Sequence, residues 1–226
     1  MSSNEKGVAT MRKLFEYGGI AASVVLIAFG AGSIGIGAWG INNVRDNLKL
    51  EQITGTPDMT PSAIKAEAGK AGLTGVTFPS CNVAGQSINN GSKARCFASY
   101  MRIHALEATG GYTYSQMGRY QALPNAPKSE LAAGGGTDND QFAVTDPKTK
   151  QPVANGLRNL WVTETALTTA LNTAFFAERV GVFGIVMGIA LLLTGIGFLI
   201  LTLGGALRRR EVAAAEIARH PVPATG

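Results

Sequence analysis

Residues 178–210, ERVGVFGIVMGIALLLTGIGFLILTLGGALRRR, decide the fold. From Val180 to Leu207 there are 28 residues without an ionisable side chain, and 16 of them are Val, Ile, Leu or Phe. A helix needs only about 20 residues to cross a hydrocarbon core about 30 Å thick. The run ends at three consecutive arginines, which are typical of the cytoplasmic face of a membrane. The sequence therefore predicts a transmembrane helix over residues 180–207.

A second apolar run, Tyr17 to Val44, is also 28 residues long and uncharged. A cleaved signal peptide is the alternative, but its apolar region has only about 7–15 residues. We therefore expect a retained transmembrane helix over residues 17–44.

Two spans with both tails on one side form a hairpin. The two tails hold seven basic residues, which favours the cytoplasm for both of them because short basic flanks stay inside. The loop between the spans is long enough to be translocated whatever its charge. The sequence thus predicts a multi-pass protein of the bacterial cell membrane with cytoplasmic termini and an extracytoplasmic central loop.

The net charge of +5 does not require a nucleic-acid partner. Seven basic and four acidic residues lie in the tails, and thirteen basic and eleven acidic residues lie in the loop. The loop charges of both signs are interspersed, unlike a stripe that follows a phosphate backbone. We expect no nucleic acid among the partners.

The fold class that follows is an α-helical membrane protein, in which two transmembrane helices flank an α-rich extracytoplasmic domain with long irregular loops. In the exterior domain, helical periodicity predicts a helix over residues 92–109, stopped by two glycines, and a short helix that starts at Thr60 and Pro61. The expected order starts with a cytoplasmic tail (1–16), followed by the first span (17–44) and the exterior domain (45–179). The exterior domain contains an insertion loop (about 122–152) and a stalk helix (about 156–179). The stalk helix runs into the second span (180–207), which is followed by a cytoplasmic tail (208–226).

Cys81 and Cys96 are the only cysteines, and both fall in the exterior loop. An oxidising compartment favours a disulfide between them, and Asn90-Gly91 is a turn signal that can bring the two together. The alternative is a pair of buried free thiols.

The second span carries four glycines on one helical face, namely Gly181, Gly184, Gly188 and Gly195. Small residues four apart let two helices approach closely in lipid, so this face predicts a helix-packing seam. Its partner is the first span, a second copy of the chain, or another protein. Pairing within the chain is the simplest of these.

His104 is the only histidine of the exterior loop and the one weak candidate for a ligand or proton-transfer residue. It shares a helical face with Phe97, Met101 and Ala108, where a histidine is more often a hydrogen-bonded core residue. The other histidine, His220, lies across the membrane in the expected topology, which excludes a site with two histidines from one chain. No nucleophile elbow, nucleotide fingerprint or metal-ligand spacing occurs. We expect no catalytic residues, no metal and no cofactor.

Three stretches resemble a family of uncharacterised bacterial two-span membrane proteins whose members are often labelled aromatic ring-opening dioxygenase. They are VRDNLKLEQITGTPD, MRIHALEATGGYTYSQM and TALNTAFFAERVGVFGIVMGIALLLTGIGFLIL, residues 44–58, 101–117 and 169–201. The resemblance covers about two thirds of the chain and implies the two-span architecture. Residues 121–151 and the cysteine pair depart from shorter members of that family. The resemblance carries no functional residue over to this chain.

The sequence favours a non-enzymatic accessory or scaffold protein whose exterior domain binds an envelope protein or a lipid. Two alternatives stay open. One is an envelope enzyme that uses His104 with Glu107 or Tyr112, and the other is a small homo-oligomeric transport component assembled through the glycine seam. Neither span contains Asp, Glu, Lys, Arg or His, which disfavours a solitary carrier or channel.

Overall fold

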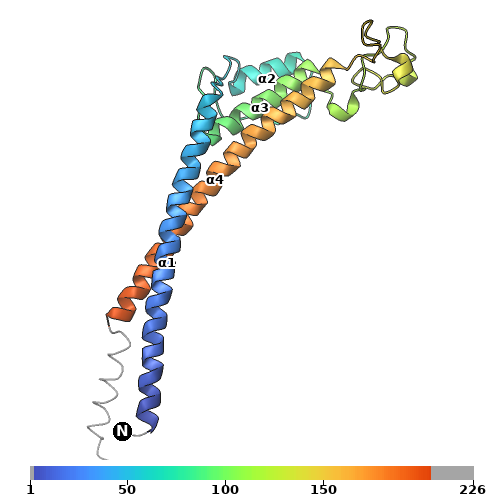
Figure 1. The fold of residues 1–226 in the computed structure, drawn as a ribbon. Coiled ribbons are helices and arrows are strands. Elements are labelled where there is room, and N and C mark those ends of the chain that lie inside the picture. The colour runs from blue at the N-terminus through green and yellow to red at the C-terminus, as the bar shows by residue number, and fades with distance from the viewer. Residues whose placement is uncertain (1–2, 205–226) are drawn as a thin grey trace, which may run out of the picture. The chain divides into compact units, whose positions relative to one another are not determined.

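The computed structural model describes residues 3–204 and is mostly helical, with no β-strand in that part of the chain. This confirms the helical class. The predicted tail over residues 208–226 and the last three residues of the predicted second span lie outside the described residues. In chain order the α-helices are α1 (Ser3–Leu50), α2 (Pro61–Lys70), α3 (Gly91–Ala108) and α4 (Gly156–Leu203) (Figure 1).

The chain divides into two compact units. One contains the segments up to Gly40 and from Val180, and the other is Ile41–Arg179. α1 and α4 each contribute to both units, because neither helix is interrupted at the boundary. The expected run of the stalk helix into the second apolar stretch is therefore present as one helix.

In the first unit, α1 and α4 approach each other through glycines. A methyl group on Gly188 would lie 2.7 Å from the carbonyl oxygen of Gly30, and one on Gly37 would lie 2.6 Å from the carbonyl oxygen of Gly181. A methyl group on Gly195 would lie 2.8 Å from the side chain of Ile27. Gly184 is less tightly packed, since its added methyl group would be 3.6 Å from the nearest atom. The four predicted seam glycines thus face α1 of the same chain.

The remaining sides of this helix pair are covered by exposed apolar side chains. Phe29 and Ile36 of α1 are 69% and 72% exposed, and Phe183 and Leu193 of α4 are 65% and 63% exposed. The pair therefore presents large apolar side chains outward along both helices.

The Ile41–Arg179 unit has a buried core around α3, to which α1, α2 and α4 all contribute. Tyr100 and Ile103 of α3 are fully or almost fully buried, as are Ile64 of α2 and Met59 just before it. The cluster is completed by Leu48, Ala68, Val83, Ile88, Ala94, Cys96, Phe97, Ala98 and Leu171.

Local signals explain where the two shorter helices begin. The Thr60 side chain accepts a hydrogen bond from the Ala63 backbone N–H at 3.2 Å, and Pro61 fills the first position of α2, where no N–H is needed. The Asn90 side chain caps α3 in the same way, accepting from Lys93 N–H at 3.0 Å.

The predicted insertion loop has no regular helix or strand beyond two short 3-10 helices, Lys128–Glu130 and Asp140–Phe142. Backbone hydrogen bonds nevertheless organise it. Tyr120 forms one isolated bridge with Thr137 in the middle of the insertion and another with Ala154, which joins the two ends of the insertion.

Candidate functional site

A cluster of ionisable side chains surrounds His104 on the Ile41–Arg179 unit. The turn before α2 places Asp58 beside this histidine, with 2.7 Å between Asp58 Oδ2 and His104 Nε2. Glu67 of α2 completes the group, since one ligand atom from each of the three residues lies within 4.8 Å of the other two. All three side chains are half-buried. The packing of α2 against α3 therefore builds this group from residues far apart in the sequence.

Glu107 lies one turn after His104 on α3 and belongs to the same electrostatic environment. Burial raises the pKa of Glu107; the charge of His104 lowers it, and the charges of Glu67 and Asp58 raise it further. Burial also raises the pKa of Asp58, but hydrogen bonds from Thr56 and the backbone, together with His104, bring this pKa below its ordinary value. The cluster thus holds two carboxyl groups whose pKa values move in opposite directions.

Two buried polar atoms in this cluster have no hydrogen-bond partner. They are Nε2 of His104 and Oε1 of Glu107, each shielded from solvent. The 2.7 Å contact between His104 and Asp58 is close enough for an ion pair, but it lacks the alignment of a hydrogen bond. A buried polar atom without a partner costs about 1–3 kcal/mol, so this site favours a ligand that satisfies both atoms.

The chemistry available to this arrangement is proton exchange or cation ligation. An imidazole can act as a proton donor or acceptor. The same imidazole nitrogen and carboxylate oxygens are also ligands for divalent metal ions.

His104 also lines an apolar groove of about 540 Å³ between α3 and α4. Met101 and Leu167 contribute to its walls, and Glu164 is the one acidic residue that lines it. The Glu164 side chain is only 3% exposed, its Oε1 has no hydrogen-bond partner, and its nearest cation, Arg102, is 4.0 Å away. The groove therefore combines apolar walls with a buried, weakly paired carboxylate.

Tyr112, the predicted alternative companion of His104, lines a different cavity of about 760 Å³ with Arg102 and Gln116. Its backbone oxygen accepts hydrogen bonds from Trp161 Nε1 at 2.7 Å and from Thr109 Oγ1 at 2.6 Å. Of the two predicted companions, Glu107 is the one that the structure brings into the His104 cluster.

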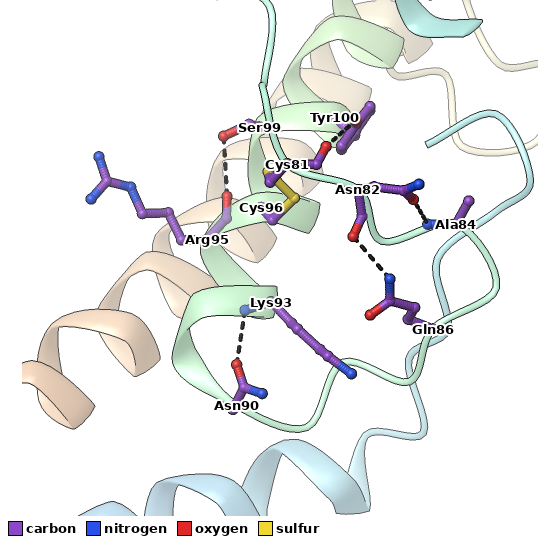
Figure 2. Close-up of a disulfide and its surroundings, with 10 residues drawn as sticks. All are labelled: Cys81, Asn82, Ala84, Gln86, Asn90, Lys93, Arg95, Cys96, Ser99 and Tyr100. Carbon is purple, nitrogen blue, oxygen red and sulfur yellow. Dashed lines mark hydrogen bonds between the residues drawn. A yellow bond between two sulfur atoms is a disulfide. The ribbon is translucent and has the colours of Figure 1, made fainter. Parts of the chain in front are cut away.

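Cys81 and Cys96 form a disulfide that ties the segment before α3 to the first turns of this helix (Figure 2). The Tyr100 hydroxyl donates a hydrogen bond to the Cys81 carbonyl oxygen at 2.6 Å, one turn further along α3 (Figure 2). The disulfide and this hydrogen bond together hold the segment around Cys81 against one side of α3.

Glu178 joins three helices at one end of the unit. Its Oε1 accepts a hydrogen bond from Arg45 Nη2 of α1 at 2.6 Å, and its Oε2 accepts from the backbone N–H of Gly91 at the start of α3. The next residue, Arg179, donates to the Ser92 side chain at 3.0 Å. A carboxylate at a helix N-terminus is favourable because it complements the helix dipole.

Sequence reasoning found His104 and Glu107 but missed Asp58, Glu67 and the role of Glu178. Asp58 precedes the recognisable cap of α2, yet no spacing rule connects it with a histidine 46 positions later. Glu178 marks only the edge of the apolar run in the sequence. These contacts depend on tertiary packing and have no local signal.

No family model, curated protein or solved structure matches this chain. The site is therefore interpreted from its own geometry.

Proposed function

We propose that the chain is a membrane-anchored, non-enzymatic accessory or scaffold protein whose Ile41–Arg179 unit binds an envelope protein or a lipid outside the cytoplasm. The observation that carries the anchor is the outward display of large apolar side chains by α1 and α4. In the most apolar 18-residue stretch of each helix, only 11% is buried. The core helix of a water-soluble protein would be mostly buried. Residues 17–44 and 180–207 are the proposed spans.

The proposed orientation rests on charge and on the disulfide. Basic tails favour cytoplasmic termini, and the Cys81–Cys96 disulfide suits an oxidising compartment on the other side. The resemblance to two-span bacterial membrane proteins agrees with this arrangement.

The proposed binding role rests on the apolar groove between α3 and α4. Grooves with apolar walls and few polar groups are typical of ligand-binding surfaces. The walls suit an apolar segment of a protein or an acyl chain.

Membrane insertion and orientation can be tested with two single-cysteine additions, because both native cysteines are joined in a disulfide. Thr149→Cys should react with a membrane-impermeant maleimide in intact cells, whereas Lys13→Cys should react only after permeabilisation. The protein should also stay with membranes in alkaline carbonate. Release by carbonate, or equal labelling of the two variants in intact cells, would contradict the proposal.

The binding role can be tested by purification of the full chain from native membranes in mild detergent, with quantitative mass spectrometry of proteins and lipids. A stoichiometric companion is expected. Ala108→Arg, which places a long charged side chain at the groove, should reduce its recovery, while Ala133→Arg on the insertion loop should not. A protein that purifies alone, or a companion retained equally by both variants, would argue against this role.

The second candidate function is an envelope enzyme that uses His104, and the observation that favours it is the gathering of Asp58, Glu67 and Glu107 around this histidine. A His104→Ala strain that keeps every phenotype of the wild type would remove this candidate.

Homo-oligomeric transport through the glycine seam is less well supported, because the seam glycines lie against α1 of the same chain. A Gly188→Cys variant should give no cross-linked dimer, and an efficient dimer would revive the idea.

A further inference from the structure

The His104 cluster contains more negative charge than its neighbours offset. Asp58, Glu67 and Glu107 supply three carboxyl groups to one site around a single imidazole. Among residues 3–204, neither Glu67 nor Glu107 forms an ion pair with a lysine or arginine. Carboxylates crowded in this way repel each other unless a cation or protons intervene.

The unpartnered atoms give an independent reason to expect a cation. His104 Nε2 is buried and close to Asp58 Oδ2, yet the two are not aligned as donor and acceptor. A simple histidine–aspartate pair would align them and would leave Oε1 of Glu107 unexplained. A divalent metal ion is coordinated by the lone pairs of several such atoms at once.

The spacing is suitable for a small divalent ion. Ligand atoms bound to one ion at about 2.0–2.2 Å lie within roughly 4 Å of each other. The three atoms here already lie within 4.8 Å, so modest side-chain rotations bring them to binding distance. The residues come from the turn before α2, from α2 and from α3, which are held by the buried core and the disulfide.

We propose that Asp58, Glu67 and His104 bind a divalent transition-metal ion of the zinc class, with Glu107 as a third carboxylate that ligates directly or through water. The mixed nitrogen and oxygen donor set favours this class, since Ca²⁺ takes six to eight oxygen ligands. The site goes beyond the proposed anchoring and binding role and does not depend on it.

Isothermal titration of ZnCl₂ into the full-length protein, stripped with EDTA and kept in mild detergent, tests this site. One high-affinity equivalent is expected. His104→Gln and Asp58→Asn should each weaken binding by about 100-fold or more, because loss of a direct ligand costs at least as much as loss of a supporting residue. His220→Gln and Asp138→Asn are the matched controls and should bind like the wild type.

Three outcomes would overturn the site. They are no binding by the wild type, unchanged binding by His104→Gln, and loss of binding by His220→Gln. Calcium at the same concentration as zinc should not displace zinc from the wild type. If His104→Gln still bound zinc and calcium displaced it, the ion would occupy a carboxylate-only surface site instead.

X-ray absorption at the zinc edge of the wild-type complex keeps the proposal testable if a variant fails to fold. The expected first shell has one imidazole nitrogen and otherwise oxygen atoms. A shell without imidazole, or one that contains sulfur, would contradict it.

Discussion

The two units of this chain hold their helices together by opposite means. Between α1 and α4 of the first unit, the contacts are backbone against backbone, made possible by Gly30, Gly37, Gly181 and Gly188. The Ile41–Arg179 unit relies on a disulfide, helix caps, ion pairs and a carboxylate cluster.

Hydroxyl groups show the contrast in part. In the first unit, Ser23, Thr194 and Thr202 each donate to the carbonyl oxygen four residues earlier in their own helix. In the second unit, Ser99 and Thr163 form the same bond within their helices, but the Tyr100 hydroxyl also donates to the Cys81 carbonyl oxygen of another segment. Hydroxyls that bond within their own helix need no water, which suits an apolar environment. The difference indicates that steric fit holds the first unit, whereas polar and covalent links hold the second.

The largest expected effect is removal of the disulfide by the double variant Cys81→Ala/Cys96→Ala. Closure of a loop of this size stabilises by about 3 kcal/mol, so the Ile41–Arg179 unit should melt at a lower temperature. Trp161 is buried in this unit and Trp39 is 68% exposed in the other. Fluorescence in a Trp39→Phe background therefore reports the second unit alone.

The control for this variant is the wild-type protein with reductant, which should reproduce the shift. If the Trp161 transition were unchanged in both cases, the disulfide would not be a principal link of this unit.

The next largest effect tests the glycine contact. Gly188→Ala puts a methyl group 2.7 Å from a backbone oxygen, which should cost about 1–3 kcal/mol because the helices must separate. Gly197→Ala is the matched control on the same helix, since its methyl group would meet nothing within 4 Å. Circular dichroism in mild detergent should show earlier helix loss for Gly188→Ala only, with an unchanged Trp161 transition. Equal melting of the two variants would exclude a tight seam.

Much of the helical layout could be predicted from the sequence, because its signals are local. Thr60 and Pro61 start α2 as expected, and α3 spans residues close to the predicted 92–109. The end of α1 was less predictable. The predicted span stops at Val44, but the helix continues to Leu50, and Gln52 takes a positive φ of 51°.

The candidate site was predictable only through His104 and its neighbour Glu107, which share a helix. Asp58 and Glu67 reach this histidine through the packing of α2 against α3, a tertiary arrangement that no periodicity encodes. The glycine face of α4 was visible in the sequence, whereas the choice of α1 as its partner depends on the fold.

A moderate effect is expected from Glu178→Ala, which removes the carboxylate that Arg45 and the Gly91 N–H share. Hydrogen bonds to charged groups contribute about 1.5–3 kcal/mol, and the exposure of Arg45 places this one at the lower end. Asp46→Asn is the matched control, because the Asp46–Lys49 pair is exposed and lies within one helix. The free energy of unfolding followed by Trp161 fluorescence should decrease for Glu178→Ala. For the control it should change by no more than about 0.5 kcal/mol. A reversed order would show that Glu178 does not join the helices.

The smallest effect concerns Asp138 in the insertion loop, which accepts from the Arg119 backbone N–H at 3.0 Å. This backbone hydrogen bond lowers the pKa of Asp138 below its ordinary value; burial opposes the shift, and the Arg119 guanidinium adds to it. A carboxyl group whose pKa is lower in the folded state stabilises above its unfolded pKa, and the contribution disappears as the pH falls through the folded value.

Hydrogen exchange of the full chain between about pH 6 and about pH 3 measures this loss at one amide. The protection factor of the Arg119 amide should fall with acid, and Asp138→Asn should lower it at the upper pH and remove its pH dependence. The Leu123 amide is an internal control, since it donates to the backbone oxygen of Phe142, which does not titrate in this range. Equal acid loss at both amides would mean that the whole loop opens, and Asp138 would then not be the group that titrates.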